Sequence, residues 1–220
     1  MLLFIHPTII VLTIFNTLLA SVTIAGTLAV NASVPVPPPV EAPPVEAPPA
    51  IPEPVATIKV WVLPNANHVE STLLTALQRR GIDDRNAIAT VMGNVKQESR
   101  FTPNICEGGA RVSYWGCNAG GYGLIQWTTS DRYRGLGSHA YRIGLDPSTA
   151  QAQISFMFTE RQWKSLEPYL RKKGYSINHY MSKSYRWLGW GVHGNRTTYA
   201  YNYASQLVTR DVPVTELTDV

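Results

Sequence analysis

The chain of 220 residues contains only two cysteines, Cys106 and Cys117. Two cysteines are too few for a disulfide-rich miniprotein or for a four-cysteine zinc site. The sequence also lacks the glycine-rich phosphate motifs of the Walker and dinucleotide-binding types. Charged residues make up only 15% of the chain and hydrophobic residues 45%, which is enough apolar material for a packed core. We therefore exclude a wholly disordered chain and expect one globular domain with attached segments.

Charge is missing from the beginning of the chain, because residues 1–33 contain no Asp, Glu, Lys or Arg. The largely apolar run 8–32 is long enough to cross a bilayer, which takes about 20 residues. A cleavable signal peptide normally has a basic start, which is absent here, and small residues before the cut, which Val30-Asn31-Ala32 could supply. For residues 1–33 we therefore keep two alternatives, a signal peptide and a signal-anchor transmembrane segment.

Proline dominates the next segment, residues 34–56, in which it occupies ten positions. The sequence Val-Glu-Ala-Pro-Pro occurs there twice in succession, over residues 40–44 and 45–49. Proline fixes φ and removes backbone donors, so we expect an extended polyproline II linker with a length of roughly 70 Å. We expect it to hold the globular domain, residues 57–220, away from a membrane.

All 19 lysines and arginines fall after residue 56, where only 12 acids accompany them. The resulting charge of +7 favours an anionic partner, such as nucleic acid, anionic lipid or an acidic cell-wall polymer. Because an export segment would place the domain where nucleic acid is scarce, we expect no nucleic-acid partner. We expect a monomer that needs no cofactor, with the membrane contacted through the N-terminal segment.

Hydrophobic spacing predicts that the globular domain is mostly helical. One helix is expected over residues 68–80, ended by Gly81, and a second begins after a cap at Asp83 or Asp84. Asp146-Pro147 is expected to open a further helix, and a last helix is expected to start near Asn195. Six glycines lie between Phe101 and Gly123, so this region is expected to be a loop or short hairpin.

The second predicted helix places a carboxylate at the end of an apolar stripe. The stripe continues at helical spacing to Glu98, and its apolar members are Ala87, Ile88, Val91, Met92 and Val95. Burial and the negative end of the helix dipole both raise the pKa of a carboxyl group, as a general acid near neutral pH requires. The alternative is a solvated Glu98 paired with Lys96 or Arg100.

Two motifs in this region resemble those of a known family. Gly93-Asn94 precedes Glu98-Ser99 and Phe101, and Gly121-Tyr122-Gly123-Leu124 precedes Gln126-Trp127 in an expected strand-like element. Their order and spacing resemble the phage tail lysozyme-like domain of the lysozyme and lytic transglycosylase superfamily, over about residues 66–210. The resemblance implies an α+β lysozyme-like fold and a phage origin. Domains of this family usually belong to large virion proteins. A short chain with its own export segment differs from that pattern.

The resemblance implies cleavage of the β-1,4 bond between the amino sugars of peptidoglycan, with Glu98 as general acid. Tyr122 and Gln126 would contact the sugar, Trp127 would be a sugar platform or a core aromatic, and Ser99 would support the site. The catalytic domain would then act outside the cytoplasm, exported, membrane-anchored or on the virion. A non-catalytic wall-binding module on a stalk is the alternative function.

The presence of a second catalytic carboxylate decides between a hydrolase and a lytic transglycosylase, because glycoside hydrolases normally use two carboxylates. Glu107 lies nine residues after Glu98, and Ser113 six residues further, which echoes the catalytic triad of another phage endolysin class. Asp131 is another option. If no second carboxylate serves, a hydroxyl of the substrate attacks instead and the enzyme is a lytic transglycosylase.

The two cysteines bracket ten residues of the glycine-rich loop. After export, a Cys106–Cys117 disulfide would close this loop, whereas two reduced thiols are expected in the cytosol. A catalytic cysteine acting with His139, His179 or His193 is an alternative that no motif supports. Aromatic residues crowd the C-terminal third, where they could form a cleft wall or core: Tyr185, Trp187, Trp190, Tyr199, Tyr201 and Tyr203.

Overall fold

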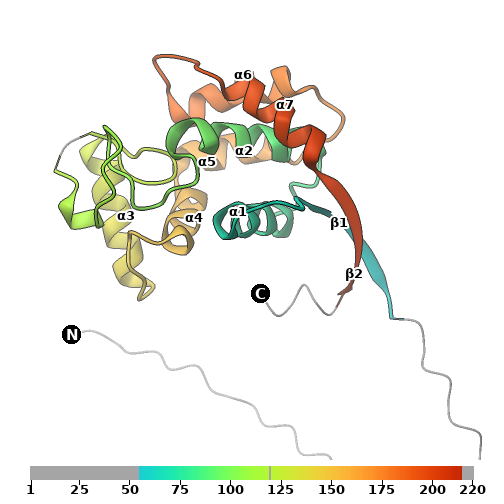
Figure 1. The fold of residues 1–220 in the computed structure, drawn as a ribbon, viewed down its shortest axis with the longest axis horizontal. Helices are drawn as coiled ribbons and strands as arrows, with labels where there is room; N and C mark the ends of the chain where they lie inside the picture. The colour runs from blue at the N-terminus through green and yellow to red at the C-terminus, as the bar shows by residue number, and fades with distance from the viewer. Residues whose placement is uncertain (1–54, 119, 215–220) are drawn as a thin grey trace, which may run out of the picture. The chain divides into compact units, whose positions relative to one another are not determined.

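The computed structural model describes residues 55–118 and 120–214. Within these ranges the chain forms seven α-helices, one short 3-10 helix and a two-stranded sheet (Figure 1). The expectation of a mostly helical domain is therefore confirmed. The expected export segment and residues 34–54 of the expected linker lie outside the described residues. No helix in the described part of the chain is both long and apolar enough to span a membrane.

The elements follow one another along the chain with short connections, apart from one long loop. They are β1 (Thr57–Val62), α1 (His68–Arg79), α2 (Arg85–Ser99), η1 (Tyr114–Gly116), α3 (Ser130–Arg142), α4 (Ala150–Thr159), α5 (Arg161–Leu170), α6 (Ile177–Leu188), α7 (Arg196–Gln206) and β2 (Val208–Pro213).

The two strands join the beginning and end of the described domain. β1 and β2 pair antiparallel, from Thr57 opposite Pro213 to Val62 opposite Val208. The side chain of Gln78 docks β1 onto α1, because it accepts a hydrogen bond from Trp61 N (2.6 Å) and donates one to Trp61 O (2.9 Å). The sequence patterns did not predict this pairing, because the paired residues are far apart in the sequence; Val60 and Arg210, for example, are 150 positions apart.

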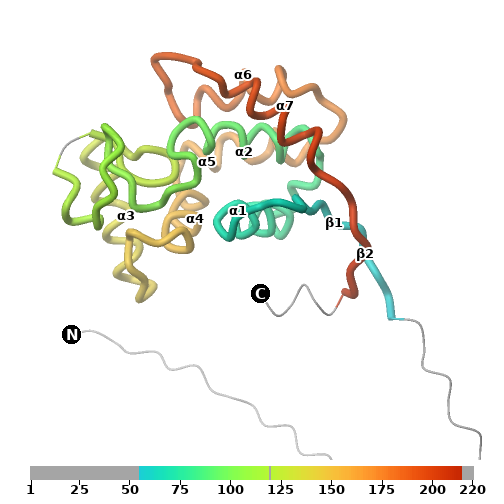
Figure 2. The backbone as a smooth tube through the Cα atoms, in the orientation of Figure 1, coloured from blue at the N-terminus to red at the C-terminus, as the bar shows by residue number. Residues whose placement is uncertain are grey.

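Local signals set the start of α2 as expected. The Asp84 carboxylate accepts hydrogen bonds from Asn86 N and Ala87 N, at 2.9 and 3.0 Å, and so caps the helix. The helix ends where Arg100 and Phe101 adopt positive φ angles of 52° and 61°. Figure 2 shows that the chain then enters the long loop beside α3.

The expected start of α4 is wrong. The helix begins at Ala150, with the Thr149 side chain as its cap, and Asp146-Pro147 lies in a turn before it. The Asp146 carboxylate accepts a hydrogen bond from Ser148 N (2.7 Å), so it stabilises this turn instead of the helix. The α7 prediction is confirmed, because the helix begins at Arg196, directly after Asn195.

α2 is the central helix and packs against α1, α6 and α7 (Figure 1). It approaches α7 closely at Gly93, where an added Cβ would lie 2.6 Å from Ala200 N and 2.7 Å from Arg196 O. Only glycine fits this crossing without displacing backbone. The first turn of α7 is thereby held beside the last turns of α2.

Candidate active site

Glu98 lies in the last turn of α2, at the end of the predicted apolar stripe. All five apolar members of that stripe are at most 1% exposed, and the Glu98 side chain is 16% exposed. Burial raises the pKa of Glu98 above its ordinary value of 4.5. Arg196 and, more weakly, Arg132 act in the opposite direction but do not outweigh the burial. Glu98 therefore combines restricted solvent access with a raised pKa.

The ion-pair partner of Glu98 is Arg196, at the first position of α7, and not Lys96 or Arg100. The Arg196 side chain is 5% exposed, and its Nη2 donates to Glu98 Oε1. Its Nη1 donates to the backbone oxygens of Val192 (3.2 Å) and His193 (2.8 Å). The guanidinium is thus fixed by backbone on one side and by the carboxylate on the other.

Sequence reasoning missed Arg196. It lies 98 residues after Glu98, and no local pattern connects the two. The one signal that could have pointed to Arg196 was its position. It is a long cationic side chain at the first residue of the helix whose apolar face packs on α2. The pair itself depends on the close crossing at Gly93, which brings the backbone of Arg196 and Ala200 against α2.

Ser99 connects the end of α2 to the second motif. Its side chain is buried, and its Oγ donates to Leu124 O (2.9 Å) and, more weakly, to Val95 O (3.3 Å). Leu124 N in turn donates to Gln153 Oε1 of α4 (2.8 Å). These bonds hold the segment 121–127 against the residue that follows Glu98.

The segment 121–127 is a tight turn, which corrects the expectation of a strand-like element. The backbones of Tyr122 and Trp127 bond to each other, and the residues between them form the turn. Gln126 has a φ of 54°, and its Nε2 donates to Gly123 O (2.9 Å). Positive φ at Gly123 and Gln126 is incompatible with an extended strand. Gln126 remains half-buried at the surface of the turn.

The two aromatic residues of the turn lie in the core. Tyr122 and Trp127 are both 0% exposed. The Tyr122 hydroxyl donates to Val112 O (3.1 Å), and the Trp127 ring packs against Phe156 at 5.6 Å between centroids. In this structure neither ring presents a face on which a sugar could stack. Both rings support the turn from the side of the core.

Glu107 and the cysteines belong to the long loop. The exposed Glu107 side chain accepts a hydrogen bond from Gly121 N (2.8 Å), and Glu107 N donates to Gly121 O (2.8 Å). Cys106 and Cys117 form a disulfide with a Cα–Cα distance of 5.5 Å, so neither is a thiol nucleophile in this structure. The loop is thereby fastened to the same turn that Ser99 holds.

The other candidates are outside this arrangement. Ser113 is exposed, and the Asp131 side chain is 98% exposed and pairs with Arg134. His139 is buried and bonds to Ser155 Oγ (2.9 Å). Among residues 55–118 and 120–214, no three His, Cys, Asp or Glu side chains gather as a metal site would require.

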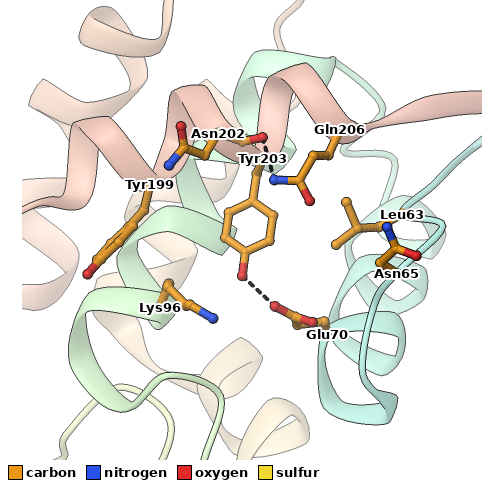
Figure 3. Close-up of a pocket in the computed structure, with 8 residues that line it drawn as sticks. All are labelled: Leu63, Asn65, Glu70, Lys96, Tyr199, Asn202, Tyr203 and Gln206. Carbon is orange, nitrogen blue, oxygen red and sulfur yellow. Dashed lines mark hydrogen bonds between the residues drawn. The ribbon is translucent and has the colours of Figure 1, made fainter.

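The C-terminal aromatics divide between core and surface. Trp187 and Tyr203 are at most 6% exposed, whereas Tyr185 and Tyr201 are about half exposed. Tyr199 and Tyr203 line a polar hollow of about 340 Å³ between α1, α2 and α7 (Figure 3). There the Tyr203 hydroxyl donates to Glu70, and the Lys96 amine points into the same hollow. Glu98 is not among the residues that line it.

Comparison with known proteins gives a family for the chain. Searches of curated proteins and of solved structures found no match. The family model described as phage tail lysozyme matches residues 70–207, a range that includes α2, the loop, the turn and α7. A lysozyme-like, peptidoglycan-degrading function is typical of such a domain, and action outside the cell or on a virion is compatible with it. Since the match covers well over half of the sequence, the chain belongs to the phage tail lysozyme family.

Proposed function

We propose that this domain cleaves the β-1,4 glycosidic bond between the amino sugars of peptidoglycan, with Glu98 as its general acid. The observation that carries the proposal is the partly buried carboxyl of Glu98, with its raised pKa, at the end of α2. A general acid must hold its proton near the working pH and still reach the substrate. An exposed fraction of 16% leaves Glu98 that access.

Arg196 would serve the step as a positioning residue. Glu98 gives its proton to the leaving glycosidic oxygen and becomes a carboxylate in a poorly solvated place. The buried guanidinium of Arg196, which already donates to Glu98 Oε1, would stabilise that carboxylate. Before proton transfer the same contact limits how far burial can raise the pKa of Glu98.

The turn 121–127 would form the neighbouring substrate surface. Gln126 is half-buried and is the member of the turn motif that we propose to bond to the sugar. Ser99, Tyr122 and Trp127 would act indirectly, because their side chains are buried and hold the turn in place.

Glu107 is the second carboxylate that we propose to test first. Its hydrogen bond from Gly121 N places it at the same turn and leaves one carboxylate oxygen for a water molecule. If Glu107 activates that water, the enzyme is a hydrolase. If Glu107 is dispensable, a hydroxyl of the substrate attacks and the products end in an anhydro sugar.

The decisive experiment is digestion of purified peptidoglycan by the full chain, with products identified by mass spectrometry. We expect Glu98→Gln to abolish sugar release without unfolding the domain, because glutamine can still accept from Arg196. Asp211→Asn, on the exposed face of β2, is the matched control and should leave release unchanged. Muramic acid at the reducing end would identify a hydrolase, and anhydro-muramic acid a transglycosylase.

Retained release by Glu98→Gln would refute the assignment of Glu98. No release by the unmodified chain, together with sedimentation on cell walls, would favour the alternative of a wall-binding module. We further propose that residues 1–33 export or anchor the chain and that residues 34–56 space the domain from a membrane. Cell fractionation of the full chain, with and without residues 1–33, tests this placement.

A further inference from the structure

A small aromatic hollow lies between α6, the segment 189–195 and the start of α7. It has a volume of about 220 Å³, and three rings line it, those of Tyr185, Trp190 and His193. Asn178, Ser182 and Thr197 add hydroxyl and amide groups to the lining. No carboxylate, lysine or arginine occurs among the described residues that form it.

The rings are held in a fixed arrangement. The Tyr185 and Trp190 rings meet edge to face with centroids 5.4 Å apart, and the Trp190 and His193 rings do so at 5.7 Å. His193 also contacts the Thr197 hydroxyl through Nε2 (3.2 Å). A hollow whose rings are already ordered loses little freedom when a ligand binds.

The hollow adjoins Glu98 through a single side chain. The Arg196 guanidinium lies 4.7 Å from the centre of the Trp190 ring, and the same guanidinium donates to Glu98. Trp190 and Glu98 therefore both contact the buried guanidinium of Arg196.

The lining fits a neutral sugar better than a charged group. A pyranose ring presents C–H groups that pack on an aromatic face and hydroxyls that bond to polar side chains. The hollow in Figure 3 offers a different chemistry, since Lys96 and Glu70 give it charged groups and the Tyr203 hydroxyl is already bonded to Glu70.

We propose that the hollow of Tyr185, Trp190 and His193 is a sugar-binding subsite, which takes a neutral N-acetylated amino sugar of the glycan strand beside the bond at Glu98. This assignment rests on the proposed function for the identity of the polymer. Tyr185, which is 53% exposed, forms the accessible wall of the subsite.

The test measures binding in the absence of turnover. The full chain carrying Glu98→Gln is titrated calorimetrically with a β-1,4-linked tetramer of N-acetylglucosamine. Adding Tyr185→Ala should weaken binding about tenfold, which corresponds to about 1.4 kcal/mol. Adding Thr197→Val should weaken it about threefold by removing one hydroxyl from the same lining. Tyr199→Ala, an aromatic truncation on the side of α7 that faces the hollow in Figure 3, should leave the affinity unchanged.

Unchanged affinity in both Tyr185→Ala and Thr197→Val would overturn the subsite, as would a failure of the Glu98→Gln chain to bind the tetramer. A loss confined to Tyr199→Ala would place the glycan in the other hollow and overturn it as well. The proposed function is judged separately by sugar release from peptidoglycan. Release with no effect of Tyr185→Ala or Thr197→Val on binding would refute only the subsite, and binding that depends on both without release would refute only the proposed activity.

Discussion

Removing the guanidinium of Arg196 should change both the stability of the domain and the pH dependence of its activity. In Arg196→Ala the Glu98 carboxylate loses the partner that opposes its desolvation, so its pKa should rise further above 4.5. Loss of one member of a buried ion pair costs about 3–5 kcal/mol. Because Glu98 is 16% exposed and can take up a proton, we expect a smaller loss of about 2–3 kcal/mol at pH 7.

The sign of the pH effect follows from the raised pKa. A carboxyl whose folded-state pKa lies above its unfolded value lowers the stability of the fold once the unfolded chain is ionised, because folding must then either bind a proton or bury a charge. The penalty is therefore absent below about pH 4.5 and grows as pH rises towards the raised pKa of the variant. Urea unfolding should consequently show a larger difference between the unmodified chain and Arg196→Ala at pH 7 than at pH 4.

The activity of the same variant supplies a second readout. A general acid works in its protonated form, so the alkaline limb of the rate profile reports its pKa. In Arg196→Ala this limb should move to higher pH, and Arg196→Lys should reverse part of the shift. Arg132→Gln should shift it in the same direction but less, because Arg132 is the weakest of the influences that lower the pKa of Glu98.

Arg210→Ala, which removes an exposed arginine on β2, is the control. It should change neither the free energy of unfolding nor the position of the alkaline limb. A stability loss that is equal at pH 4 and pH 7 would refute this role of Arg196. An alkaline limb that stays in place or moves to lower pH would refute it as well.

Three further changes test the packing around the site. Gly93→Ala places a Cβ within 2.7 Å of backbone atoms of Arg196 and Ala200, so it should lower the free energy of unfolding by about 1–3 kcal/mol. Gly191→Ala, with nothing within 4 Å, is its control in thermal unfolding, and an equal effect of the two would contradict the close crossing. Ser99→Ala leaves Leu124 O without its side-chain donor and should cost about 1–2 kcal/mol. It should also slow sugar release, whereas the exposed Ser205→Ala should not; equal rates would remove Ser99 from the support of the turn. Replacing Cys106 and Cys117 together by serine should cost about 3 kcal/mol for a loop of this length, measured by urea unfolding, and reductant should lower the melting temperature of the unmodified chain only. A melting temperature that does not respond to reductant would contradict this role.

Several features of the fold could be predicted because their causes are local. The cap at Asp84 needs only the amides of the next three residues, and the stripe on α2 needs only the helical repeat. The same stripe predicts the position of Glu98 at the edge of the core, where its side chain lies. The short motifs around Glu98 and Gln126 predict the family, which the family match confirms.

Two local patterns led to wrong predictions, one through a competing local bond and the other through distant partners. Asp146-Pro147 has the local pattern of a helix start, but the Asp146 side chain bonds within its own turn and Pro147 O accepts from Gln153. The motif 121–127 is predicted to be strand-like, yet Ser99 and Gln153 hold it as a turn from outside the segment. Neither partner lies within the window that a local pattern covers.

By itself the sequence determined the helical framework, the end of α2 at which Glu98 lies, and the family to which the chain belongs. The tertiary structure decided what surrounds Glu98. It selected Arg196 as the ionic partner, placed Tyr122 and Trp127 in the core, and set the aromatic hollow beside the guanidinium. The physical reason is that hydrophobic periodicity specifies which face of a helix is buried, whereas the environment of a buried charge depends on which helix covers that face. Here the crossing of α7 over Gly93 makes that choice.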